Sequence, residues 1–225
     1  MKIDILTLFP EMFEGLKTSL IGKATEKNLV EINIINIRDF SNDKHGKVDD
    51  YIFGGGDGML MMPAPLYDAI NSVKTKDSWV IYLSPKGTPL KQAKVKELAK
   101  TKEHLVLVCG HYEGIDERVI ELCIDEQISL GDFVLTGGEI PAMALTDAVC
   151  RYIPNVLHNE NSTEEESFSD NYLEYPQYTR PQEFMGLKVP DVLVSGNHAK
   201  IKEWREEQKI IQTKKYRPDL LDKKD

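Results

Sequence analysis

The stretch ISLGDFVLTGGEIPA, residues 128–142, carries the strongest signal for the fold. Its apolar opening is typical of a strand that meets Gly131, and its end is typical of the start of a helix. Gly137 and Gly138 lie directly before that helix. Glycine beside regular structure is costly unless the backbone turns sharply or another group comes close. The stretch therefore predicts a strand-to-helix connection at which the chain is either bent or closely approached.

Short, β-rich apolar runs alternate with helical patterns over the first two thirds of the chain. Several runs are nearly uniformly apolar, as strands covered on both faces are. Alternating strands and helices predict an α/β domain with a mostly parallel sheet. Pro89 suits the first turn of one of these helices. The expected strands are 2–8, 30–37, 79–84, 104–109 and 127–130. The expected helices are 11–27, 64–74, 89–100, 116–123 and about 139–152.

The composition changes after this region. Residues 158–170, HNENSTEEESFSD, are polar and acidic with almost nothing to bury, which is typical of a flexible linker. Residues 198–212 are then expected to form an amphipathic helix, with Ile201, Trp204, Ile210 and Ile211 near one face. The expected organisation is a main α/β domain at 1–158, a linker at 159–169 and a small, mainly helical domain at 170–225.

The charge is unevenly distributed along the chain. The formal net charge is −9, yet residues 188–225 hold ten Lys and Arg against seven Asp and Glu, a balance of +3, so the rest carries −12. Non-specific binding of nucleic acid depends on neutralising phosphates. The overall charge therefore argues against a general nucleic-acid coat, although it leaves room for a local basic surface near the end of the chain.

The sequence gives no sign of a membrane segment or of disulfides. No apolar run approaches the length that crosses a bilayer, and Asp4 within the opening apolar run favours a strand over a signal peptide. Cys109, Cys123 and Cys150 lie in apolar segments without CxxC spacing. We therefore expect buried free thiols in a reducing compartment, a cytoplasmic location and no membrane partner.

Three glycine-bearing segments each follow an expected strand. They are YLSPKG (82–87), VCGHYEG (108–114) and LGDFVLTGG (130–138). In an open α/β sheet, ligands bind outside the carboxyl ends of the strands. Each segment alone is better explained as an ordinary tight turn, but together they predict a pocket that presents backbone groups to a flat ligand.

Other motifs narrow the possible functions. YIFGGGDGMLMMP (51–63) is rich in glycine, but no GK[ST] follows Gly58 and the spacing does not fit GxGxxG, so a tight loop followed by core methionines is favoured. The histidines show no paired-ligand spacing, which argues against structural zinc. The absence of GxSxG argues against a serine hydrolase.

Several charged residues are candidates for chemistry. Asp116 and Glu117 are explained by a helix start, where acids are favoured, whereas Glu113 has no such structural explanation. Arg151 is either a partner of a helix C-terminus or a functional cation. Asp170, just after the expected linker, is either a solvated acid or a functional carboxylate.

The order of the motifs identifies a family. The segments YIFGGGDGM, YLSPKG, CGHYEGIDERV, GDFVLTGGEIPAM, YTRP and LVSGNH resemble, in this order, the bacterial tRNA (guanine-N1)-methyltransferases of the SPOUT class. The resemblance runs from Met1 to Leu221, with Asp57 as a small departure in the glycine loop. It implies transfer of the methyl group of S-adenosylmethionine (SAM) to N1 of guanosine 37 of tRNA, giving 1-methylguanosine. A SPOUT 2′-O-ribose RNA methyltransferase and a non-catalytic RNA-binding SPOUT protein are the alternatives.

The resemblance also implies an architecture that spacing does not indicate. It implies a SPOUT-type α/β domain tied in a deep trefoil knot, followed by a small helical tRNA-binding domain. General rules of chain connection predict an open, unknotted sheet instead. The family resemblance further implies a homodimer with the active site at the subunit interface.

Roles for individual residues follow from the same resemblance. Asp170 is expected to be the general base, Arg151 to stabilise charge at O6 of the guanine, and Glu113 to lie near the guanine or the sulfonium of SAM. Mg²⁺ is also implied, with unknown ligands. SAM is expected to be held mainly by backbone. The residues expected to bind it are Leu83, Ser84, Pro85, Gly87, Gly110, Tyr112, Glu113, Gly114, Leu130, Gly131, Phe133, Leu135, Gly137 and Gly138.

Overall fold

A computed structural model describes residues 1–157, 163 and 166–221 of the chain. The chain divides into two compact units, Met1–Glu160 and Asn161–Asp225. Most of the linker expected at 159–169 lies outside the described residues.

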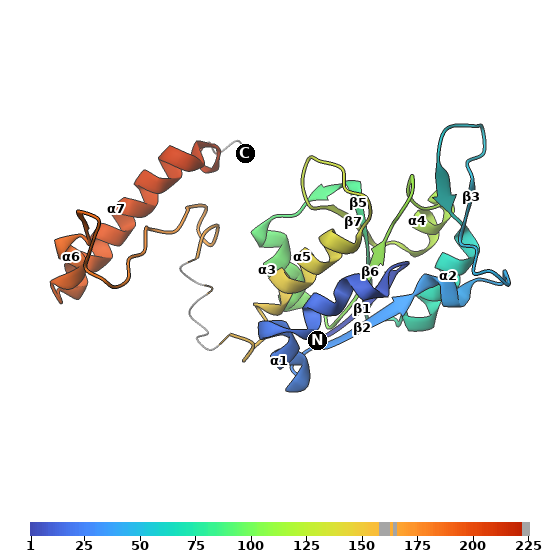
Figure 1. The fold of residues 1–225 in the computed structure, drawn as a ribbon, viewed down its shortest axis with the longest axis horizontal. Helices are drawn as coiled ribbons and strands as arrows, with labels where there is room; N and C mark the ends of the chain where they lie inside the picture. The colour runs from blue at the N-terminus through green and yellow to red at the C-terminus, as the bar shows by residue number, and fades with distance from the viewer. Residues whose placement is uncertain (158–162, 164–165, 222–225) are drawn as a thin grey trace. The chain divides into compact units, whose positions relative to one another are not determined.

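The first unit is built on a five-stranded sheet in which every pair of neighbouring strands is parallel (Figure 1). The order β2-β1-β6-β5-β7 places β6 at the centre, and all of its side chains are buried, as expected for a strand covered on both faces. The predicted α/β class and parallel sheet are therefore confirmed. The strands are β1 (Lys2–Thr7), β2 (Glu31–Asn36), β5 (Ser78–Pro89), β6 (His104–Cys109) and β7 (Glu126–Ser129).

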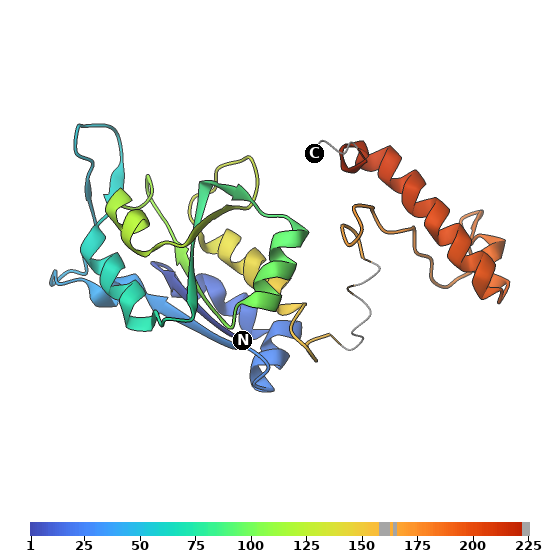
Figure 2. The ribbon, with the colours of Figure 1, turned by 180° about the vertical axis from the view of Figure 1, so that it is seen from behind.

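Helices cover both faces of this sheet, as the views from the front and from behind show (Figures 1 and 2). One face packs against the 3₁₀ helix η1 (Pro10–Lys17), α1 (Ser19–Glu26), α3 (Gln92–Thr101) and α5 (Glu139–Cys150). The other face packs against the 3₁₀ helix η2 (Ile37–Phe40), α2 (Pro63–Val73) and α4 (Glu117–Cys123).

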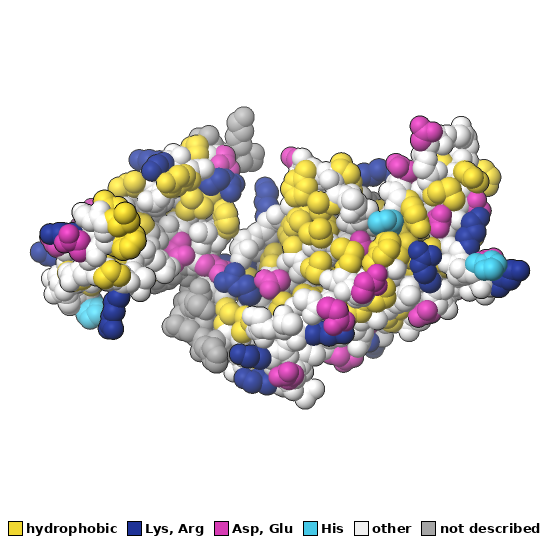
Figure 3. All heavy atoms as spheres, in the orientation of Figure 1, with side chains coloured by type: hydrophobic (Ala, Val, Ile, Leu, Met, Phe, Trp, Pro, Cys, Tyr) yellow, Lys and Arg dark blue, Asp and Glu magenta, His cyan; other side chains and the backbone are white. Residues whose placement is uncertain are grey.

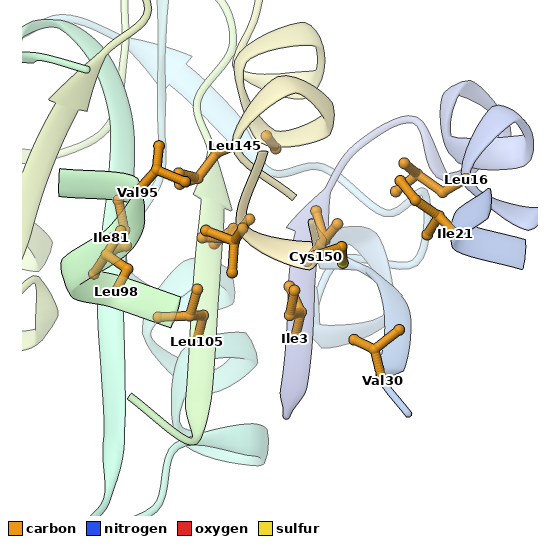
Figure 4. Packing of buried hydrophobic residues seen from close by; sticks show 14 of the residues in the cluster. Ile3, Leu16, Ile21, Val30, Ile81, Val95, Leu98, Leu105, Leu145 and Cys150 are labelled. Atoms are coloured by element: carbon orange, nitrogen blue, oxygen red, sulfur yellow. The ribbon is translucent and has the colours of Figure 1, made fainter. Parts of the chain in front are cut away.

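The core on the α5 side joins the strands to the helices directly. Ile3, Ile81 and Leu105 of neighbouring strands are fully buried, and Leu98 of α3 and Leu145 of α5 pack onto them (Figure 4). Burying each such side chain contributes about 1.5–3 kcal/mol. This packing fixes α5 against the strands. It therefore also limits where the segment that leads into α5 can lie.

The expected helix at 11–27 is wrong in one respect, because two separate helices cover that region. Thr18 has an extended backbone and its hydroxyl donates a hydrogen bond to the Gly15 carbonyl, which ends η1. Ser19 then has φ 56°, so the chain turns before α1. A break of this kind leaves the 3.6-residue apolar pattern almost unchanged, which explains why the pattern predicted one helix.

The placement of Pro89 in a helix is also wrong. Strand β5 continues past an irregularity between Leu83 and Thr88, and Pro89 pairs with Ser129 of β7. The Leu90 N–H donates to the Ser129 carbonyl over 2.8 Å. Proline is tolerated at such a strand end because no ladder hydrogen bond is lost there.

The second unit holds a two-stranded hairpin and a long helix. It comprises β8 (Glu183–Phe184), β9 (Leu187–Lys188), α6 (Asp191–Val194), α7 (His198–Tyr216) and the 3₁₀ helix η4 (Pro218–Leu220). The expected apolar face of α7 is only partly right: Ile210 and Ile211 are exposed, and the buried residues are Lys209 and Thr213. The preceding segment packs against this other side, because the Leu173 N–H donates to Thr213 Oγ1.

The three cysteines are buried and free, as predicted. Burial raises the pKa of the Cys109 thiol well above its ordinary value, and burial raises that of Cys150 to about 12. Of the helices described in residues 1–157 and 166–221, none combines the length and the apolar character needed to cross a membrane.

Replacing Gly87 by alanine tests how closely the paired strands β5 and β7 approach each other at the irregularity in β5. A Cβ there would lie 2.5 Å from both the Gln127 carbonyl carbon and the Ile128 nitrogen, so the two backbones must separate. We expect Gly87→Ala to lower the free energy of unfolding by about 1–3 kcal/mol, measured by urea titration. Gly15→Ala is the control, since nothing lies within 4 Å of its Cβ position. Equal free energies of unfolding for Gly87→Ala and Gly15→Ala would contradict this close approach of β5 and β7.

Candidate active site

A pocket of about 240 Å³ lies where β5, β6 and β7 end. Its volume is slightly below the range of about 300–1,000 Å³ found for small-molecule sites. All three glycine-bearing segments identified in the sequence contribute to its walls. The pocket therefore occupies the position at which open parallel sheets bind ligands.

Most of the residues expected to bind a cofactor line this pocket. Gly87 and Gly131 do not: Gly87 lies at the contact between β5 and β7, and Gly131 lies against the ring of Phe133. The expected residues that line the pocket are Leu83, Ser84, Pro85, Gly110, Tyr112, Glu113, Gly114, Leu130, Phe133, Leu135, Gly137 and Gly138.

The glycines before α5 allow two stretches of backbone to touch. The Gly138 N–H donates a hydrogen bond of 2.8 Å to the Gly110 carbonyl, and Gly137 pairs with His111 in an antiparallel bridge. Gly138 has an ordinary φ of −83°, but a Cβ there would lie 2.7 Å from the Cα of Cys109. Of the two predicted reasons for glycine at this position, close approach is therefore the correct one.

This contact requires the chain to return across the sheet. Strand β7 lies at the edge, and β5 separates it from β6. The connection between residues 130 and 138 therefore passes the end of β5 before it reaches the end of β6. Side chains in this connection remain exposed: Phe133, Val134 and Leu135 are all accessible.

A buried carboxylate, that of Glu139, holds the start of α5 next to the contact between Gly138 and Gly110. Glu139, the first residue of α5, is buried, and Thr7 Oγ1 at the end of β1 donates a 2.9 Å hydrogen bond to its Oε1. A carboxylate at a helix N-terminus is favoured by the helix dipole. The Nδ1 of His111 is buried nearby and has no hydrogen-bond partner among the described residues. Glu139 thus ties the start of α5 to the carboxyl end of the sheet.

Glu113 is positioned by a hairpin that the sequence did not predict. Strands β3 (Asp49–Tyr51) and β4 (Met59–Met61) pair antiparallel, and the Glu113 N–H donates to the Met59 carbonyl over 3.0 Å. A Cβ on Gly58 would lie 2.6 Å from Cγ of Glu113. Of the expected core methionines, Met61 is buried, whereas Met59 and Met62 are only partly buried. The hairpin stands out from the first unit in Figure 1.

The acidic residues after Glu113 stabilise the N-terminus of the helix that follows. Asp116 is the N-cap of α4, and its Oδ1 accepts a 3.0 Å hydrogen bond from the Arg118 N–H. Hydrogen bonding from the Arg118 side chain lowers the pKa of the Asp116 carboxyl. The predicted structural role of Asp116 and Glu117 at the start of α4 is confirmed. Glu113 and Glu117 both line the pocket, and Glu113 is the one of the two without a role in the helix.

Tyr82 is a pocket residue that the sequence reasoning missed. It lies within the apolar run of β5, is almost fully buried, and lines the pocket. Burial raises the pKa of its phenol. A tyrosine in an otherwise apolar central strand was the available signal, because a buried hydroxyl needs a polar partner.

Arg151 does not lie at this pocket within one chain. The pocket includes Gly138, at the start of α5, while Arg151 follows the last residue of that helix. A helix of 12 residues is about 18 Å long. Beyond Arg151, Ile153 and Pro154 line a separate hollow at the opposite end of the sheet, with Met1 and Lys2. Asp170 belongs to the second unit.

The described part of the chain contains no cluster of side chains suited to a metal ion. Within residues 1–157, 163 and 166–221, no group of three or more His, Cys, Asp or Glu side chains is arranged to hold a metal ion. The pocket is lined by glycine backbone, by tyrosine, serine, threonine, lysine, histidine and glutamate side chains, and by apolar residues.

Comparison with known proteins places the chain in one family. Residues 1–223 match the family model described as tRNA (Guanine-1)-methyltransferase TrmD. The chain is 54% identical to a tRNA (guanine-N(1)-)-methyltransferase of Staphylococcus carnosus, over 99% of this chain and 91% of the relative. It is 56% identical to the protein of the same name from Ruminiclostridium cellulolyticum, over 99% of this chain and 97% of the relative. A third such protein, from Clostridioides difficile, is 54% identical over 99% and 98%.

Proposed function

The chain belongs to the tRNA (guanine-1)-methyltransferase family, and from that premise we propose that it methylates N1 of guanosine 37 of tRNA, with SAM as the methyl donor. Family membership makes it a tRNA (guanine-N1)-methyltransferase; the nucleotide position, the site residues and the assembly are the proposal. The observation that carries the proposal is the pocket at the crossing of residues 137–138 over the end of β6.

The pocket suits a methyl donor with a flat purine and a charged centre. Backbone groups of the crossing give hydrogen bonds that do not depend on side chains, and the exposed Phe133 and Leu135 offer apolar surface to a purine ring. The carboxylate of Glu113 complements a sulfonium charge. Bound SAM supplies an activated methyl group, and the chain's part is to hold it and to present the base.

Guanine N1 carries a proton at neutral pH, which must leave before the nitrogen can accept a methyl group. A positioned carboxylate is a suitable general base, and we assign this role to Asp170. As the proton leaves, negative charge develops toward O6. A fixed cation at that oxygen stabilises the transition state by an amount on the order of 3 kcal/mol, and we assign this role to Arg151.

A second copy of the chain is part of the proposal. The roughly 18 Å length of α5 separates Arg151 from the pocket of its own chain, so a pocket that uses Arg151 takes it from a partner. Exposed apolar side chains gather at the connection between β7 and α5 (Figure 3), where a second subunit would cover them. We therefore propose a homodimer with the active site at the subunit interface.

The trefoil knot also belongs to the proposal. Its support is the path of residues 130–138, which leave the edge strand β7, pass the end of β5 and reach β6. The crossing at Gly138 is the contact that such a threaded chain needs.

We propose that the second unit makes contacts with the tRNA. Its C-terminal part, residues 188–225, has a balance of +3 within a chain of net charge −9. A locally basic segment of this kind predicts tRNA affinity that falls steeply with salt. Mg²⁺ commonly binds through one or two carboxylates together with substrate oxygens. The described residues do not form a metal site by themselves, so no step is assigned to the ion.

Replacing Asp170 by asparagine tests the proposed general base. The amide keeps the shape of the side chain but accepts no proton, so we expect the single-turnover rate of methyl transfer to fall about 10²- to 10⁴-fold. SAM affinity, measured by calorimetry, should stay unchanged. Asp191→Asn, an exposed acid of the same unit, is the control and should keep normal turnover. Near-normal turnover by Asp170→Asn would show that another group removes the proton.

A pair of glycine variants tests the role of Glu113. Gly58 and Gly54 have almost equal φ angles of +92° and +91°, so alanine should cost each roughly 1–2 kcal/mol of stability. Only at Gly58 does the new Cβ displace Glu113, since nothing lies within 4 Å at Gly54. We expect Gly58→Ala to lower the single-turnover rate at least about 10-fold more than Gly54→Ala. Equal rates in the two variants would remove Glu113 from the proposed site.

A further inference from the structure

Lys209 of α7 is a buried cation in the second unit. It is only 8% exposed, although lysine is almost never buried unless it is paired. Its Nζ lies 3.3 Å from Oε1 of Glu206 on the same helix and 3.5 Å from Oδ2 of Asp170 on the segment before the helix. The side chains of Asp170 and Glu206 are both more than half exposed, so solvent reaches the two carboxylates that pair with Lys209.

The segment that carries Asp170 is attached to the same side of α7. Thr213 lies one helical turn after Lys209, is fully buried, and accepts a 2.9 Å hydrogen bond from the Leu173 N–H. The Thr213 hydroxyl in turn donates to the Lys209 carbonyl over 2.7 Å. One side of the helix therefore holds both the backbone of the segment, through Thr213, and its carboxylate, through Lys209.

The charge on Lys209 persists in this setting. Burial acts to lower the pKa of the ammonium, but the negative charges of Asp170 and Glu206 outweigh that effect and raise it overall. The neighbouring cations face aromatic rings: Arg205 lies over Tyr175 and Arg217 over Phe168. Among the ion pairs of the described residues, Asp170 is joined to Lys209 alone.

We infer that Lys209 is a positioning residue for methyl transfer, because it holds the Asp170 carboxylate in one place on α7. The inference rests on the proposed role of Asp170 as general base. Oδ2 of Asp170 is directed to Lys209, and Oδ1 accepts a long hydrogen bond of 3.4 Å from the Tyr172 N–H. A carboxylate held in this way loses less freedom when guanine arrives, and misplacement by about 1 Å is enough to cost about 10²-fold in rate.

The experiment compares three variants of the full-length protein in single-turnover methyl transfer with saturating tRNA. Lys209→Met keeps the apolar stem but removes the charge, and we expect a rate roughly 10- to 100-fold below wild type. Lys209→Arg keeps a cation and should recover most of the rate. Lys202→Met removes an equal charge from an exposed position of the same helix and controls for altered tRNA affinity. The dissociation constant for tRNA should change equally in the two methionine variants.

A double-mutant comparison distinguishes failure of the inference about Lys209 from failure of the proposed role of Asp170. In the Asp170→Asn background, Lys209→Met should cause no further loss of rate, whereas a merely structural role would lower it again. A wild-type or higher rate for Lys209→Met, in a protein whose thermal unfolding is unchanged, would overturn the inference and leave the base intact. Near-normal turnover by the Asp170→Asn single variant would instead overturn the proposed function of Asp170.

Discussion

The close contact between Gly138 and the end of β6 is the constraint on which the site depends. The edge strand β7 and the helix α5 meet the rest of the domain there, and a side chain at residue 138 would collide with backbone, not with a movable group. The hydrogen bond from Gly138 to Gly110 joins two of the three segments that line the pocket. Glu139, anchored to Thr7, then fixes the direction in which α5 leaves. The pocket is therefore a consequence of the path that the backbone takes from β7 past β5 to β6.

The same geometry bears on how the proposed site is assembled. Helix α5 starts at the pocket and carries Arg151 away from it, while Asp170 lies in a separate unit attached to α7. Glu113 is the proposed catalytic side chain that stays at the pocket, held there by the β3–β4 hairpin. The proposed use of Arg151 at this pocket therefore requires a second subunit, as in the proposed homodimer.

Much of the fold was predictable because its signals are local. The uniformly apolar run at 104–109 predicts a central strand, and Asp116 before Glu117 predicts a helix start. Features set by distant partners were not: Pro89 pairs with Ser129 of another strand, and the hairpin at 49–61 is held by the segment at 113–116. The three pocket segments follow from glycine at strand ends, but the burial of Tyr82 at the pocket and of Lys209 on α7 does not, since each depends on residues distant in the sequence. For Arg151 and Asp170 the sequence left a structural and a functional interpretation open, and the family resemblance alone assigned them roles in the reaction.

The most direct test of this account is the chemical identity of the methylated nucleoside. The wild-type protein would be incubated with methyl-labelled SAM and unmodified tRNA, and the tRNA then digested and its nucleosides separated. The account predicts label in 1-methylguanosine, and loss of that label when guanosine 37 is replaced by adenosine. Label in 2′-O-methylated nucleosides, or label that persists after the replacement, would contradict it.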